Sequence, residues 1–141
     1  MKKRVVITVA LVAALGGGAY KFALAKPAEP EHKVDGFGYV LPREFVVNLD
    51  GDRFAKVSVS LLLLEDTVFP EEEGKPPEGF GPLEQEALVR DIVTDVITGT
   101  PASSLIRRSG RRRLKKRIVK RLRAETDVLV EDVLLMDVTV Q

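Results

Sequence analysis

Few residues in this sequence combine the types and the spacing that catalysis or metal binding requires. His32 is the only histidine and cysteine is absent, so a thiolate nucleophile or a site with two imidazoles is excluded. Ser103 and Ser104 have only this distant histidine to activate them. Asp50 and Asp52 lack the further carboxylates of a calcium loop, which favours a tight turn. We therefore predict no catalytic site, no cofactor, no metal site and no small-molecule substrate.

The charged residues are more informative, because the two signs are separated along the chain. The net charge is only +1, from 22 basic and 21 acidic residues. Ten acidic residues lie between positions 65 and 95, whereas eleven basic residues and no acidic one lie between positions 107 and 123. We predict a partner interface in this basic stretch, at Arg107, Arg108, Arg111, Arg112, Arg113, Lys115, Lys116 and Arg117.

Three interpretations of the basic stretch stay open at the level of sequence. It is a solvated face balanced by the acidic segment of the same or a neighbouring subunit, or it docks on anionic lipid or an acidic protein partner. Nucleic-acid binding is the weakest interpretation, because no aromatic residue on which nucleobases could stack lies among the basic residues. If acidic and basic sides of neighbouring copies meet head to tail, their association should weaken as the salt concentration rises.

The elements that position these residues begin with an export segment. Residues 1–4 are Met-Lys-Lys-Arg, and residues 5–25 form an apolar run long enough for one transmembrane helix across a bilayer core about 30 Å thick. The positive-inside rule places the N-terminus in the cytoplasm and the remaining chain outside the cytoplasmic (inner) membrane. A cleavable signal peptide is the alternative, since Ala23-Leu24-Ala25 fits a cleavage site.

Two further features belong to this N-terminal region. Ala10, Ala14 and Gly18 recur every four residues, a spacing that lets two membrane helices approach closely. Residues 26–36 contain two prolines and charges of alternating sign, which predicts a stiff, solvated tether between the membrane and the domain that follows.

Residues 37–141 are predicted to form one extracytoplasmic domain of the α+β class. Alternation of apolar and polar residues predicts strands over 37–49, 53–65 and 128–140. Pro42 predicts a bend or an edge position within the first of them. Helical periodicity predicts helices over 83–98 and 111–125, with a short helical turn between them and a long acidic loop over 65–82. The predicted order is a transmembrane helix followed by β-β-α-α-β.

The same periodicity assigns individual residues to the core. Leu88 is expected on the buried side of the first helix, and Leu134 and Met136 on the buried side of the last strand. The second helix has a narrow apolar stripe, and the arginines at positions 111–113 lie off it, so we expect them to be exposed. Ser109-Gly110 is expected to end the helical turn before this second helix begins.

Several short motifs in this order resemble the FliL family of flagellar basal body-associated membrane proteins. The resemblance covers nearly the whole chain, including the single N-terminal span, and rests on the order, the spacing and a glutamine directly after the last strand. The matching stretches are Phe45–Leu49 (FVVNL), Arg53–Val57 (RFAKV), Val89–Val93 (VRDIV), Ser109-Gly110-Arg111 with Leu114-Lys115, Val133-Leu134-Leu135 and Val138–Gln141 (VTVQ).

The resemblance implies a single-pass membrane protein whose exported domain is similar to the stomatin-type (SPFH-like) fold. It also implies a homo-oligomeric ring around the flagellar stator units of the MotA/MotB type, beside the basal body. The ring would support engaged stator units and promote torque, swimming or swarming, without enzymatic activity or a cofactor. The alternative from another class is an exported, membrane-anchored scaffold or adhesion domain that binds anionic lipid or envelope polymers through its basic helix.

Overall fold

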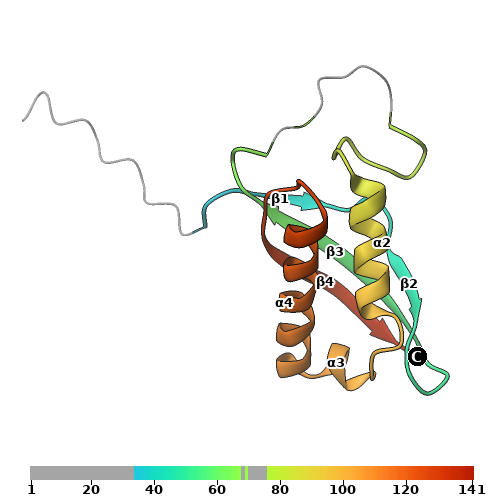
Figure 1. Cartoon of the computed structure of the whole chain (residues 1–141). Coiled ribbons are helices and arrows are strands. Elements are labelled where there is room, and N and C mark those ends of the chain that lie inside the picture. Colours follow the sequence, from blue (N-terminus) through green and yellow to red (C-terminus); the bar gives the residue numbers. More distant parts are fainter. Residues whose placement is uncertain (1–33, 68, 70–75) are drawn as a thin grey trace, which may run out of the picture. The chain divides into compact units, whose positions relative to one another are not determined.

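A computed structural model describes residues 34–67, 69 and 76–141 of the chain (Figure 1). In this part an antiparallel sheet carries three helices on one of its faces. The elements in chain order are β1 (Phe37–Val40), β2 (Phe45–Asn48), β3 (Phe54–Leu63), α2 (Glu86–Ile97), α3 (Ser103–Ile106), α4 (Arg108–Glu125) and β4 (Val130–Val140). The predicted α+β class is confirmed, but the order of elements is β-β-β-α-α-α-β.

The N-terminal predictions lie outside the described residues. These predictions are the transmembrane helix over 5–25, its small residues Ala10, Ala14 and Gly18, and most of the tether over 26–36. Within residues 34–67, 69 and 76–141, no helix has the length and apolar composition needed to cross a membrane. The anchor and the topology that follows from it therefore stay predictions.

Strand β3 is the centre of the sheet because it pairs along both of its edges. β4 follows one edge over the whole strand, with Ala55 opposite Val140, while β1 and β2 share the other edge. Every second residue of β3 from Ala55 to Leu63 is fully buried beneath the helices. This alternation is the period-two pattern from which the strand was predicted.

The first predicted strand, over 37–49, is divided into β1 and β2. Pro42 lies between them and has no N–H group to donate to a ladder, so the strand bends there. The turn predicted at Asp50 is confirmed. Gly51 and Asp52 adopt φ angles of 75° and 55°, and the N–H of Leu49 donates to the carbonyl of Arg53 at 2.7 Å.

The two residues predicted for the core of the last strand, Leu134 and Met136, are instead 40% and 46% exposed. The register between β3 and β4 shifts between the pairs Val57–Val138 and Val59–Leu135, so an extra residue is inserted in β4. Such a bulge reverses the alternation of side chains beyond it. Leu135 therefore packs against the core, and its neighbours point to the other face of the sheet.

The helices differ from the prediction at their starts. α2 begins at Glu86 rather than at 83, and Leu88 lies on its exposed side, so that prediction is wrong. The expected break at Ser109-Gly110 is also wrong, because α4 begins at Arg108 and includes both residues. A side chain on Gly110 would lie 2.7 Å from the backbone of Ser103 and Ser104, so glycine there permits close packing of α4 on α3.

Candidate functional site

Helix α4 and the residue before it, Arg107, contain the predicted basic interface. Some of these basic side chains bind the domain itself, whereas others are exposed to solvent. The buried side of α4 is a row of every fourth residue, and this row packs on the sheet and the other helices. The row consists of Gly110, Leu114, Ile118 and Leu122. Because 3.6 residues complete a turn, residues displaced by two positions from this row point away from the core.

Two of the eight predicted interface residues bind the domain itself. The guanidinium group of Arg111 donates from Nη1 to the carbonyl oxygens of Leu105 and Ile106, each at 2.9 Å. These carbonyls lie at the end of α3, so Arg111 fixes the corner between α3 and α4. Lys115 forms an ion pair with Asp132 of β4 at 2.8 Å. The expectation that Arg111 is exposed and independent of the fold is therefore wrong.

The other six predicted residues, at positions 107, 108, 112, 113, 116 and 117, are all exposed. None of them forms an ion pair with a carboxylate of residues 34–67, 69 or 76–141. Four neighbouring side chains border a hollow of about 250 Å³ near the start of α4. These side chains are Ser109, Arg112, Arg113 and Lys116.

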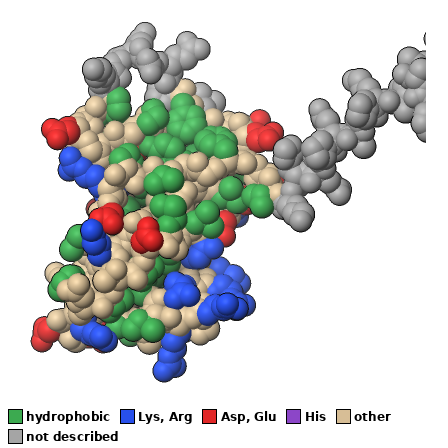
Figure 2. Space-filling view, turned by 180° about the vertical axis from the view of Figure 1, so that it is seen from behind, with side chains coloured by type: hydrophobic (Ala, Val, Ile, Leu, Met, Phe, Trp, Pro, Cys, Tyr) green, Lys and Arg blue, Asp and Glu red, His purple; other side chains and the backbone are tan. Residues whose placement is uncertain are grey.

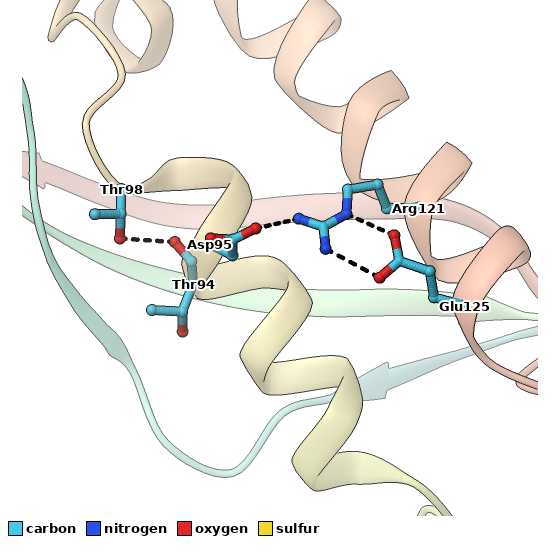
Figure 3. Close-up of polar contacts among 5 residues, drawn as sticks. All are labelled: Thr94, Asp95, Thr98, Arg121 and Glu125. Atoms are coloured by element: carbon cyan, nitrogen blue, oxygen red, sulfur yellow. Dashed lines mark hydrogen bonds and ion pairs between the residues drawn. The ribbon is translucent and has the colours of Figure 1, made fainter.

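A clamp between α2 and α4 uses one of the acidic residues expected to face a neighbouring copy. Arg121 forms an ion pair with Asp95 of α2 and donates to Glu125 from Nε at 2.7 Å and from Nη2 at 2.9 Å (Figure 3). Hydrogen bonding from Arg121 lowers the pKa of Glu125, and the two carboxylates raise the pKa of Arg121. Asp95 is thus engaged within the chain.

The sheet face opposite the helices is a second candidate surface, which the sequence analysis missed. Figure 2 shows hydrophobic side chains gathered over the upper part of the molecule, while Lys and Arg side chains gather below them. Exposed large apolar residues come from all four strands, and the most exposed of them, Val46, keeps 69% of its accessible surface. The strand register places five on this face: Val40, Val46, Phe54, Leu134 and Met136.

A buried carboxylate at the start of α2 was also missed. Glu86 is only 3% exposed, and its Oε2 accepts hydrogen bonds from the Tyr39 hydroxyl at 2.5 Å and the Gly81 N–H at 2.9 Å. Burial and the neighbouring carboxylate raise the pKa of Tyr39. The helical spacing from Glu86 to the buried Val89 and Val93 would have predicted its burial.

Glu86 has one oxygen, Oε1, that is buried without a hydrogen-bond partner among the described residues. Its other oxygen joins β1, the segment before α2 and α2 itself at one point. No group of three or more described histidine, aspartate and glutamate side chains is arranged to hold a metal ion. The chemistry that the described surfaces offer is therefore ionic and apolar binding.

The comparisons with known proteins agree with the motifs found in the sequence. The family model for the flagellar basal body-associated protein FliL matches residues 39–141. This range is most of the chain and contains both helices that form the clamp, the basic face of α4 and nearly the whole sheet. No curated protein sequence gives a significant match to the chain.

Proposed function

The chain belongs to the FliL family of flagellar basal body-associated proteins, and on this basis we propose that it is part of a ring that supports the stator units of the flagellar motor. The family is a structural component of the flagellum rather than a family of enzymes. The observation that carries the proposal is the match of the family model to 39–141, because this range contains the exposed residues named above on the sheet face and on α4.

The proposed position is the cytoplasmic membrane, crossed once by residues 5–25. The N-terminus lies in the cytoplasm, the domain lies outside it, and Ala10, Ala14 and Gly18 allow neighbouring spans to pack. The proposed partners are further copies of the chain, membrane lipid and stator proteins of the MotA/MotB type. Lys2, Lys3 and Arg4, which precede the apolar run, support this topology. We propose neither a nucleic acid nor a small-molecule substrate as a partner.

Two exposed surfaces of different chemistry support assembly through heterologous contacts, in which different surfaces of neighbouring subunits meet. The apolar sheet face is suited to contact with another copy, because monomeric proteins rarely leave so many large apolar side chains together in water. The exposed basic side chains lie on α4 rather than on the strands, and they are suited to an anionic partner. Contacts between unlike surfaces close into a ring when the rotation between subunits permits it.

The test of the proposed function is a clean deletion of the gene. We expect the deletion strain to assemble flagellar filaments but to lose speed and swarming where the load on the motor is high, in viscous medium or on a surface. The measurements are tracking of swimming cells at several viscosities and electron microscopy of filaments. A strain that has lost its filaments would contradict the stator-support role, and so would a strain that moves like the parent at every load.

A substitution on the apolar sheet face tests self-association separately. Val46→Asp should weaken the association of full-length protein in neutral detergent by about tenfold or more, because burying an unpaired carboxylate in an interface costs at least 1–3 kcal/mol. Sedimentation velocity measures the effect, and Leu88→Asp on the exposed side of α2 is the matched control. If Val46→Asp sediments like the parent while association falls with salt, ionic contacts hold the ring instead.

A further inference from the structure

The outermost residues of α4 form a row of four cations that is inclined to the helix axis. Arg108, Arg112, Lys116 and Lys120 recur at every fourth position and are all exposed. They lie opposite the buried row that begins at Gly110, since the two rows are displaced by two residues. At a rise of about 1.5 Å per residue, neighbouring cations lie about 6 Å apart along the axis and the row extends about 18 Å.

This row destabilises the helix on which it lies. Like charges at positions i and i+4 repel each other, and cations at the N-terminus of a helix oppose its dipole. The first turn of α4 contains no acidic residue, and Arg107 at the N-cap position makes no capping hydrogen bond through its side chain. No ion pair within residues 34–67, 69 and 76–141 relieves the row. An external anion would therefore stabilise the domain as it binds.

The hollow near the start of α4 is the part of the row best built for such an anion. Its volume of about 250 Å³ is many times the roughly 10–15 Å³ that one water molecule needs by the same measure, so a phosphate group has room to enter it from the solvent. Arg112 and Lys116 of the row border it, together with Arg113 and the hydroxyl group of Ser109. Guanidinium groups and a hydroxyl are donors that suit phosphate oxygens.

We propose that this row binds a linear polyphosphate chain, one phosphate group entering the hollow and others contacting the cations along α4. A nucleic acid fits less well, because no aromatic side chain lies among these cations for its nucleobases to stack on. A row of regularly spaced charges that extends about 18 Å along the helix matches an extended polyanion better than it matches a compact anion. A lipid surface fits less well, because helices that lie on membranes use an apolar face and the apolar face of α4 is buried in the core. This proposal concerns the same exposed cations of α4 that the proposed function assigns to an anionic partner, but the deletion test of that function does not depend on it.

The row has a defined boundary on the side of the sheet. Glu131 and Asp132 of β4 border a second hollow together with Lys116 and Lys120, and their carboxylates would repel a phosphate chain there. The polymer is therefore expected to follow the outer side of α4. On that side Arg113 and Arg117 are the nearest additional cations.

The experiment measures binding of linear inorganic polyphosphate to the full-length protein in neutral detergent by isothermal titration calorimetry. Each phosphate contact of a single-stranded polyanion contributes about −0.7 to the slope of log K against log salt concentration, so four contacts predict a slope near −3. Arg112→Gln combined with Lys116→Gln should bring the slope to about −1.5 and weaken binding by tenfold or more at low salt. Arg53→Gln combined with Lys56→Gln, which removes two exposed cations elsewhere, should bind like the parent.

Three results would overturn the proposal. Orthophosphate that competes equally at the same total phosphate concentration would show a site for a single anion rather than for a polymer. Binding to vesicles containing anionic lipid, lost in the row variant and without any binding to polyphosphate, would show a lipid-docking face. Equal binding of polyphosphate by the parent and the row variant would show that these cations do not form the site. Each result leaves the motility test of the proposed function unaffected.

Discussion

Replacing Glu86 with alanine is expected to lower the free energy of unfolding by about 2–3 kcal/mol, through loss of two hydrogen bonds to its carboxylate. The Tyr39 hydroxyl and the Gly81 N–H would lose their acceptor at a point where β1, α2 and the segment before α2 meet. For a domain near 100 residues, this loss corresponds to a melting temperature lower by about 10 °C or more. Circular dichroism melts of the full-length chain measure it.

Matched variants separate the hydrogen bonds from the charge. Glu86→Gln keeps an oxygen that accepts from Tyr39 and Gly81 and should be less destabilising than alanine. Glu84→Ala removes an exposed carboxylate two residues away and should leave the melt unchanged. A double-mutant cycle with Tyr39→Phe should give a coupling energy, because the two side chains share one bond. Additive effects in that cycle would mean that the contact does not stabilise the fold.

Reversing three exposed charges on α4 is expected to reduce motility most where the motor works against the highest load. The variant combines Arg112→Glu, Arg113→Glu and Lys116→Glu, all on side chains that make no ion pair with described residues. Each exposed ion pair with a partner contributes about 0–1 kcal/mol, and reversal adds repulsion, so the three changes together should weaken a contact by about 100-fold. Tracking of cells in viscous medium and swarm diameter on agar measure the effect.

The control for this variant keeps all three charges. Arg112→Lys, Arg113→Lys and Lys116→Arg should swim and swarm like the parent, and both variants should melt like the parent. Arg111 is excluded from the set, because its guanidinium group fixes the corner between α3 and α4. A charge-reversed strain with normal motility and normal protein level would show that this face is merely solvated.

The sequence predicts those parts of the fold in which apolar residues recur at the spacing of a strand or of a helix without interruption. The alternation along β3 and the three-to-four spacing along α2 and α4 each identify a buried side correctly, apart from Leu88 on α2. The bend at Pro42 and the turn at Asp50 follow from backbone chemistry that single residues impose. These predictions succeed because they depend on neighbours in the chain.

The predictions that fail depend on contacts between distant segments. The sequence near Met136 does not predict the extra residue in β4, because a bulge depends on how the two strands β3 and β4 pair. Gly110 has the local features of a helix breaker, yet it serves the packing of α4 on α3. Arg111 looks like its neighbours at 112 and 113 until the carbonyl groups at the end of α3 are placed beside it. The basic stretch could therefore be found from the sequence. The sequence could not show which of its side chains bind the domain itself and which are free of ion pairs within the described residues.

The pairing of β3 with β4 has a consequence for how the domain reaches its folded state. β3 is completed early in the described chain, whereas the strand that occupies one whole edge of it comes last, after all three helices. Contacts between such distant segments slow folding, because a long loop must close before they form. During synthesis, one backbone edge of the apolar strand β3 would stay unpaired until β4 emerges, which favours aggregation. We expect this domain to depend on a holding chaperone during that interval, and truncations that remove β4 to leave an insoluble chain.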